Sequence, residues 1–138
     1  MSIDPTEAQI LLVEDSEDDA FFFQRTLKKT RVNCQLAHVS NGPEATAYLQ
    51  ENSLRPLLVF LDLKIPMLNG FEVLKWIQNQ PAKSQWEIIV LSGSDDPQDM
   101  ASAQSFFVKD YLVKPLSVAQ LQEKVEEWIK RSANGDGS

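Results

Sequence analysis

The sequence predicts an α/β fold, a doubly wound sheet of five parallel strands. Short apolar runs of strand length alternate five times with segments of helical spacing, the pattern of strands and crossover helices in a parallel sheet. The runs at 10–13 and 57–61 are continuously apolar, as expected for strands buried on both faces. A chain of 138 residues with 43% apolar content can form one sizeable core and one domain.

Turn and capping residues divide the first half of the chain into elements. Strands are expected at 10–13, 35–39 and 57–62. Between the first two strands, Asp18 or Asp19 is expected to cap a helix that runs to about Lys29. The turn Asn41–Pro43 leads into a second helix that ends near Gln50, because proline suits the first helical position.

The second half of the chain continues the alternation. Helices are expected at 70–79, 97–106 and 117–129, and strands at 87–91 and 111–113. Pro81 stops the first of these helices, and Ser117 caps the last. The last helix carries a narrow, core-facing apolar stripe at 3–4 spacing. The stripe consists of Val118, Leu121, Val125, Trp128 and Ile129.

Composition excludes several classes of function. The net charge is −7 and no stretch supplies a basic face, so we expect no nucleic-acid partner. No apolar stretch reaches the ~18 residues of a membrane helix, and residues 1–7 lack the segments of a secretory signal. The single Cys34 allows no internal disulfide and is expected to pack in the core. We therefore expect a cytoplasmic protein without a membrane partner.

The ends of the chain carry little patterned apolar sequence. We expect residues 1–8 to form an N-terminal tail, 9–130 the folded domain, and 131–138 a disordered C-terminal tail. Because the C-terminal tail is too short to be a linker, no output domain is expected beyond it.

Acidic residues stand at the carboxyl ends of two predicted strands. Glu14 and Asp15 follow the first apolar run, and Asp62 ends the third strand. Ligands of open parallel sheets bind outside the carboxyl ends of the strands, so these carboxylates should converge. Their repulsion requires a cation, and oxygen-only ligands suit Mg²⁺. The sequence therefore predicts a magnesium site with a nucleophilic carboxylate, whereas Glu17–Asp19 are interpreted as a solvated helix N-terminus.

Two further strand ends complete a motif. The fourth strand runs into Ser92-Gly93, and the fifth runs into Lys114-Pro115. Together with Glu14-Asp15 and the loop Asp62–Pro66, this ordered set resembles the receiver domain of two-component response regulators over about residues 9–130. The resemblance implies a flavodoxin-like receiver fold with strand order 2-1-3-4-5.

The resemblance also implies the chemistry of the site. Asp62 would accept a phosphoryl group from a sensor histidine kinase or a histidine phosphotransfer protein. Glu14, Asp15, Asp62 and the backbone carbonyl of Lys64 would hold Mg²⁺. Lys114 would pair with Asp62 at rest and with the phosphoryl group afterwards.

A switch is implied by the same resemblance. Ser92 would move toward the phosphoryl group, and Tyr111 would turn inward to fill the space. The Lys114–Pro115 peptide bond is expected to be cis. Where the family usually carries Gly-Ala, this chain has Phe107-Val108, preceded by Phe106. Core burial is expected for at least one of these aromatics, and the alternative is that one or both lie on the face that the family uses for homodimer or partner contacts.

Partners are suggested by two further features. Phe21 and Phe22 on the first helix cannot both face the core, and this helix is often the kinase-docking surface of the family. The Glu-Asp start, the Trp near the end and the absent output domain are similar to small regulators paired with bacterial phytochromes. A phytochrome is therefore one candidate for the sensor kinase.

Other functions use parts of the same pattern. A haloacid-type phosphatase also forms an aspartyl-phosphate with Mg²⁺, but its second catalytic Asp falls where this chain has Lys64. A flavin-binding domain would need a hydroxyl-rich phosphate loop where this chain has Glu14–Asp19. A pseudo-receiver acting only as a binding module would lack a key residue, and none is missing. We expect a signalling domain that catalyses only its own phosphorylation and dephosphorylation.

Overall fold

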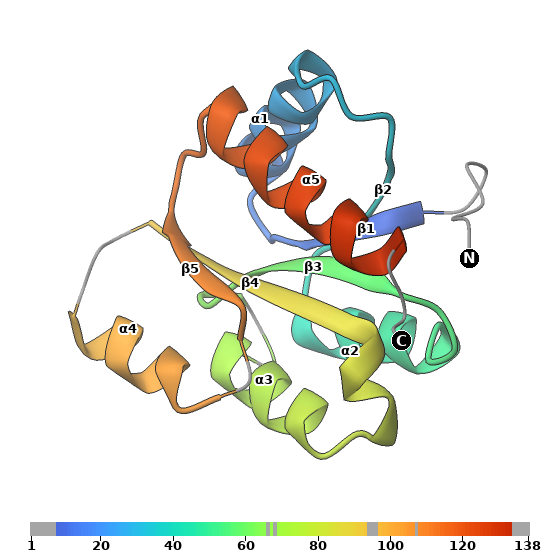
Figure 1. Cartoon of the computed structure of the whole chain (residues 1–138). Helices are drawn as coiled ribbons and strands as arrows, with labels where there is room; N and C mark the ends of the chain where they lie inside the picture. Colours follow the sequence, from blue (N-terminus) through green and yellow to red (C-terminus); the bar gives the residue numbers. More distant parts are fainter. Residues whose placement is uncertain (1–7, 66, 68, 94–96, 107, 134–138) are drawn as a thin grey trace.

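Five strands form one parallel sheet (Figure 1) in a computed structural model that describes residues 8–65, 67, 69–93, 97–106 and 108–133. The order β2-β1-β3-β4-β5 confirms the order that the sequence resemblance implied. The strands are β1 (Ala8–Val13), β2 (Gln35–Val39), β3 (Leu57–Asp62), β4 (Trp86–Ser92) and β5 (Asp110–Val113).

Register aligns the strand ends at one edge of the sheet. All six residues of the central strand β3 are buried. Strand β3 pairs with β1 up to Val13 and with β4 up to its own Asp62, while β4 pairs with β5 up to Ser92. The residues that follow these positions therefore meet at the carboxyl-terminal edge, where open parallel sheets bind ligands.

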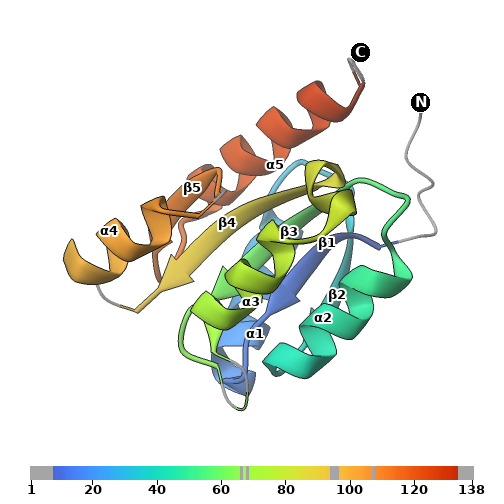
Figure 2. The same ribbon diagram turned by 90° about the horizontal axis from the view of Figure 1, so that it is seen from below.

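Helices cover both faces of the sheet (Figure 2). The helices α1 (Glu17–Lys29) and α5 (Val118–Ala133) lie on one face, and α2 (Gly42–Glu51), α3 (Gly70–Gln78) and α4 (Pro97–Gln104) lie on the other. On the first face the rings of Phe23 and Phe60 pack edge-on with centroids 5.0 Å apart. On the second face Trp76 and Trp86 stack with centroids 6.1 Å apart. Each face of the sheet therefore has its own apolar core.

The ends of α1 and α5 differ from the sequence prediction. Helix α1 is capped by Ser16 rather than by Asp18 or Asp19, because Ser16 Oγ accepts a hydrogen bond from the Asp19 N–H at 3.2 Å. Residues 131–133, which the sequence placed in a disordered tail, continue α5. The predicted stripe on α5 is confirmed, since its three central members are buried. These are Leu121, Val125 and Trp128.

The predicted end of α4 was wrong, and a short helix after α3 was not predicted. Helix α4 ends at Gln104, two residues before its predicted end, because the Phe106 N–H bonds back to the Ala103 carbonyl at 3.0 Å in a tighter turn. A 3₁₀ helix, η1 (Pro81–Gln85), connects α3 to β4 where the sequence predicted only a stop. Ala8, which the sequence placed in the N-terminal tail, begins β1, whereas residues 1–7, 134–138 and Phe107 lie outside the described residues. Within the described part of the chain, no helix is long and apolar enough to cross a membrane.

Candidate functional site

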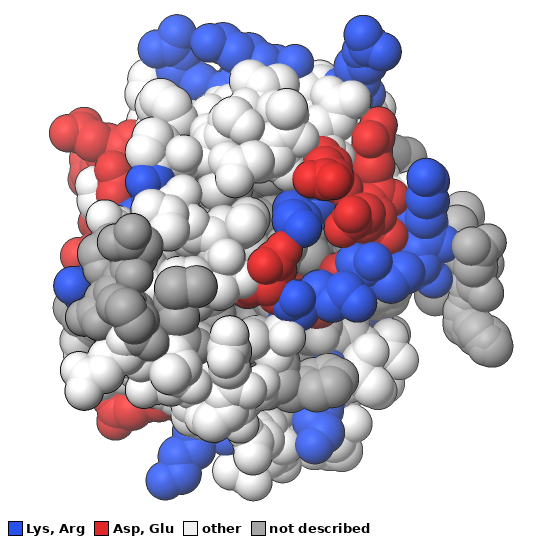
Figure 3. All heavy atoms as spheres, turned by 60° about the vertical axis from the view of Figure 1, so that its left-hand side comes forward, with Lys and Arg blue, Asp and Glu red and all other residues white. Residues whose placement is uncertain are grey.

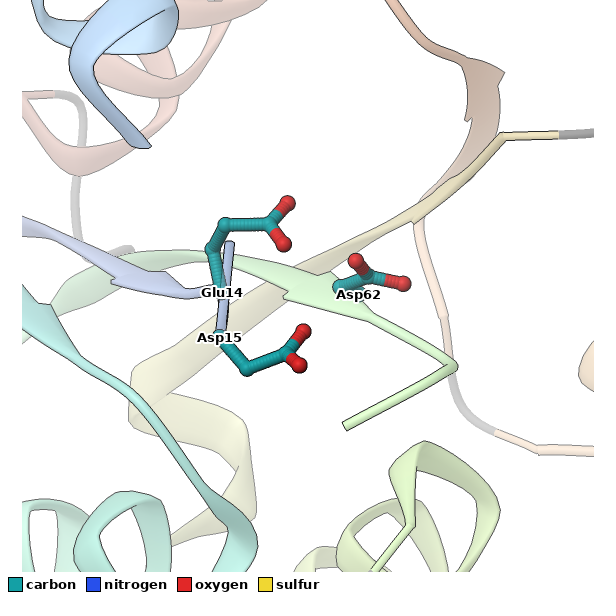
Figure 4. A group of neighbouring side chains, drawn as sticks. All are labelled: Glu14, Asp15 and Asp62. Atoms are coloured by element: carbon teal, nitrogen blue, oxygen red, sulfur yellow. The ribbon is translucent and has the colours of Figure 1, made fainter. Parts of the chain in front are cut away.

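Three acidic side chains meet at the carboxyl-terminal edge of the sheet (Figure 4). Glu14 and Asp15 follow β1 and Asp62 ends β3, and one carboxylate oxygen of each lies within 4.8 Å of the others. Glu14 and Asp62 are buried, whereas Asp15 is exposed. On this side of the molecule, acidic side chains gather around basic ones (Figure 3). The structure thus brings together the three carboxylates that the sequence predicted to converge.

The ammonium group of Lys114 forms ion pairs with two of these acids, Glu14 and Asp62, and with a fourth acid, Asp19. Its Nζ lies 2.9 Å from Glu14 Oε1, 2.9 Å from Asp62 Oδ2 and 2.9 Å from Asp19 Oδ2. The pairing with Asp62 agrees with the predicted resting state. The pairing with Asp19 corrects the interpretation of that residue as part of a merely solvated helix N-terminus.

The backbone of the loop after β3 fixes Asp62. The Lys64 N–H donates to Asp62 Oδ1 at 2.9 Å. The Gly70 N–H donates to the Leu63 carbonyl at 2.9 Å, so α3 starts directly against this loop. A Cβ at Gly70 would lie 2.4 Å from Leu63 Cα, so the close approach requires glycine. The predicted role of the Lys64 carbonyl as a metal ligand stays a prediction.

Glu14 is held by two groups that the sequence analysis missed. The Ser16 N–H donates to Glu14 Oε2 at 3.1 Å. His38 Nε2 donates to the backbone carbonyl of Glu14 at 2.7 Å. His38, the only histidine of the chain, lies on β2, which pairs with β1. The position of this histidine in a strand predicted beside the first one is the sequence signal that could have placed it near the acids.

Burial and charge shift the pKa values of two site residues. Burial, and to a smaller extent the neighbouring Asp62 charge, raise the pKa of Glu14 to about 6, although the hydrogen bond from Lys114 acts to lower it. Burial lowers the pKa of Lys114, but its hydrogen bonds to Asp19, Asp62 and Glu14 outweigh that effect and leave the pKa above its usual range. Lys114 is therefore a permanent cation in the site.

The predicted switch residues lie on the neighbouring strands. Ser92 is buried at the end of β4, and Tyr111 is half-buried on β5, packed against the core shared with α2 and α3. The Lys114–Pro115 peptide bond is cis, as the resemblance implied. Phe106 is half-buried with its ring centroid 6.4 Å from that of Phe71 on α3. The movements expected of Ser92 and Tyr111 stay predictions.

A cavity of about 500 Å³ opens beside Lys114, between α1 and the segment after β5. Apolar side chains line much of it, and the acidic side chains of Glu14, Asp18 and Asp19 line the rest. Phe22, at 50% exposure, also lines the cavity, and the neighbouring Phe21 is 60% exposed. The expectation that these two aromatics do not both face the core is confirmed, since both lie at the surface.

The donor set of the acidic cluster fits a hard divalent cation. Glu14, Asp15 and Asp62 supply only carboxylate oxygens, the ligands that Mg²⁺ and Mn²⁺ prefer. The exposed Asp15 leaves one side of the cluster open to water, and Mg²⁺ usually keeps several of its waters. The residues present are therefore suited to hold such an ion.

Comparison with known proteins identifies the family. Residues 10–126 match the response regulator receiver domain. The chain belongs to this family. Receiver domains are the partners of histidine kinases in two-component systems, and the acidic cluster with its lysine lies within the matched residues.

Several relatives are small response regulators. The response regulator Rcp1 of Synechocystis is 35% identical over 122 residues, which cover 85% of this chain and 83% of that protein. The structure of the phosphorylated cyanobacterial phytochrome response regulator RcpA is 30% identical, with a TM-score of 0.72 over 96% of this chain and 98% of that one. The Mn²⁺-bound form of Rcp1 is 33% identical, with a TM-score of 0.70 over 94% and 96% of the two chains.

Proposed function

We propose that this protein is a cytoplasmic response regulator whose receiver domain accepts a phosphoryl group on Asp62. The observation that carries the proposal is the position of Asp62. Its carboxylate lies at the end of the central strand, beside two further carboxylates suited to a cation and 2.9 Å from the Lys114 ammonium. A phosphoacceptor carboxylate needs positive charge beside it, which Lys114 supplies on one side and which a cation held by the acidic cluster would add on the other.

Different residues of the site have different roles in phosphoryl transfer. Lys64 N–H and Lys114 Nζ donate to the two oxygens of Asp62 and orient the carboxylate as a nucleophile. A carboxylate oxygen forms a bond to phosphorus as the bond from phosphorus to the donor histidine nitrogen breaks, and that nitrogen takes up a proton. Glu14, Asp15, Asp62 and the Lys64 carbonyl would hold Mg²⁺, which when bound would supply charge neutralisation for the transferring oxygens. Lys114 then donates to the phosphoryl group.

The readout is a change of packing on the neighbouring strands. The phosphoryl group adds negative charge and acceptor oxygens, which the hydroxyl of Ser92 is placed to follow. Tyr111 then turns into the vacated space, and the surface between α4 and α5 changes. We infer that this surface forms a homodimer or binds a partner in the phosphorylated state. The transition is a population shift between two packings, so each state must have its own contacts.

The proposed donor is a sensor histidine kinase, or a histidine phosphotransfer protein that carries its phosphoryl group. RcpA is a phytochrome response regulator by its description, and its similarity to this chain favours a phytochrome as the kinase. We further propose that the chain is not an enzyme for separate substrates, because phosphatases that form an aspartyl-phosphate carry a second acid where this chain has Lys64.

Phosphorylation with a small-molecule phosphodonor and Mg²⁺ tests the proposal. Intact-mass spectrometry should show one added phosphoryl group that is stable in acid and labile in base. Asp62→Asn should remain unlabelled, while Asp99→Asn, an aspartate of α4 outside the acidic cluster, should label like the parent protein. Stoichiometric labelling of Asp62→Asn at another residue would overturn the assignment. Phosphotransfer from the purified histidine kinases of the host would then identify the donor.

A further inference from the structure

Asp19 is unlike the other acceptors of the Lys114 ammonium. Glu14 and Asp62 are buried strand-end residues that belong to the acidic cluster. Asp19 instead comes from the first turn of α1, its side chain is 48% exposed, and it does not belong to that cluster. Its Oδ2 nevertheless lies 2.9 Å from Lys114 Nζ, the same distance as the other two acceptors.

The three hydrogen bonds use every donor of the ammonium group, because a lysine has three N–H bonds. When Glu14 and Asp62 bind a cation and Asp62 is phosphorylated, the bonds from Lys114 to these two acids must change. The bond from Lys114 to Asp19 can persist through both cation binding and phosphorylation. Asp19 can therefore hold the ammonium in place while its other two donors turn to the phosphoryl oxygens.

We propose that Asp19 is a positioning residue for phosphoryl transfer, one that anchors Lys114 at the edge of the site. This inference rests on the proposed function, since it concerns the same reaction. A cation that is already fixed before the reaction stabilises developing negative charge without reorganisation. Without the anchor, the flexible lysine side chain would sample orientations that point away from the phosphoryl group.

A purely structural role for Asp19 would have different consequences. An exposed ion pair contributes little to stability, and an acid in the first turn of a helix adds only a small interaction with the helix dipole. Asp18 provides the matched control, because it is an exposed acid of the same turn and lines the same cavity. Since the three donors of Lys114 are occupied by other residues, Asp18 receives no bond from it.

The test compares Asp19→Asn, Asp18→Asn, Asp19→Glu and the parent protein. With saturating Mg²⁺ and a small-molecule phosphodonor, Asp19→Asn should be phosphorylated about two- to fivefold more slowly than Asp18→Asn, the range expected for one exposed ion pair. Asp19→Glu keeps the charge and should recover most of the rate. The two asparagine variants should have equal thermal stability and equal Mg²⁺ affinity by calorimetry.

A second readout does not depend on phosphorylation. By NMR, the ammonium protons of Lys114 should exchange with water faster in Asp19→Asn than in Asp18→Asn. Equal phosphorylation rates in the two variants, or a faster rate in Asp19→Asn, would overturn the positioning role. If the parent protein itself takes up no phosphoryl group on Asp62, the proposed function fails first, whatever the lysine exchange shows.

Discussion

The carboxyl-terminal edge of the sheet has two halves that are built differently. In the half formed by β1, β3 and Lys114, the acids are already joined through one ammonium group, with three bonds of 2.9 Å each. In the half formed by β4, α4 and β5, α4 has eight residues, and Ala103 is the only buried one among its described side chains. The comparison indicates that the acidic site is preorganised, whereas α4, on the proposed readout surface, is lightly packed and can rearrange at small free-energy cost.

The largest effect on the phosphorylation rate should follow from removing the Lys114 ammonium group, which joins the acids of the preorganised half. Lys114→Met leaves the buried Glu14 and Asp62 close together without their shared ammonium, and removes a donor aimed at the phosphoryl group. Loss of one such donor lowers catalytic rates by about 10²–10³-fold, and we expect a loss of that order in the phosphorylation rate. Lys130→Met, at an exposed position of α5, is the control. A rate within threefold of the control would show that Lys114 does not act in the transfer.

The loop that carries Asp62 should be nearly as sensitive. A Cβ in Gly70→Ala would lie 2.4 Å from Leu63 Cα and 2.9 Å from the Asp62 carbonyl oxygen, so the backbone must shift. We expect a loss of about 1–3 kcal/mol in the free energy of unfolding by urea, together with slower phosphorylation. Gly93→Ala is the matched control, because a Cβ there meets no atom within 4 Å. Equal stability of the two variants would contradict the close approach.

Burial of Glu14 predicts a pH dependence of stability without Mg²⁺. Its pKa is raised from 4.5 to about 6 in the folded protein, so the folded state binds more protons than the unfolded state between these values. The stabilisation is present below pH 4.5 and is lost as the pH rises through about 6, to the extent of about 2 kcal/mol.

Glu14→Gln isolates this contribution. The difference in unfolding free energy between the parent protein and this variant should change between pH 4.5 and pH 7, the variant becoming relatively more stable as the pH rises. Saturating Mg²⁺, which favours the ionised carboxylate, should remove most of the loss in the parent protein. A difference that is flat with pH would contradict the raised pKa.

The smallest effect on the phosphorylation rate should come from the half formed by β4, α4 and β5. Ser92→Ala removes one neutral hydroxyl, which we expect to slow phosphorylation by less than about tenfold, because a neutral hydrogen bond is weaker than a charged one. Its effect on the readout should be larger. Hydrogen exchange with a beryllofluoride mimic of the phosphoryl group should change protection in α4 and β5 of the parent protein but not in Ser92→Ala. Ser102→Ala, exposed on α4, should respond like the parent.

The sheet could be predicted from sequence more closely than the site. Continuous apolar runs that end before Glu14 and before Asp62 located the strands, because burial on both faces favours apolar residues at successive positions. Asp19 was misinterpreted because acids are common in the first turn of any helix, so its residue type carried no signal. Its contact lies 95 positions away along the chain, and only the packing of α1 beside the end of β5 creates it.

The sequence separations of the Lys114 bonds have a consequence for assembly. The lysine lies 100, 95 and 52 positions after Glu14, Asp19 and Asp62. During synthesis the acids therefore emerge well before their counter-ion. Once β1 and β3 have paired, Glu14 and Asp62 repel one another until β5 docks at the far edge of the sheet. Competence to receive a phosphoryl group should arise only when the last strand is in place. A nascent or partly unfolded molecule would then not accept a phosphoryl group and would not signal. Phosphorylation would therefore be restricted to fully folded molecules.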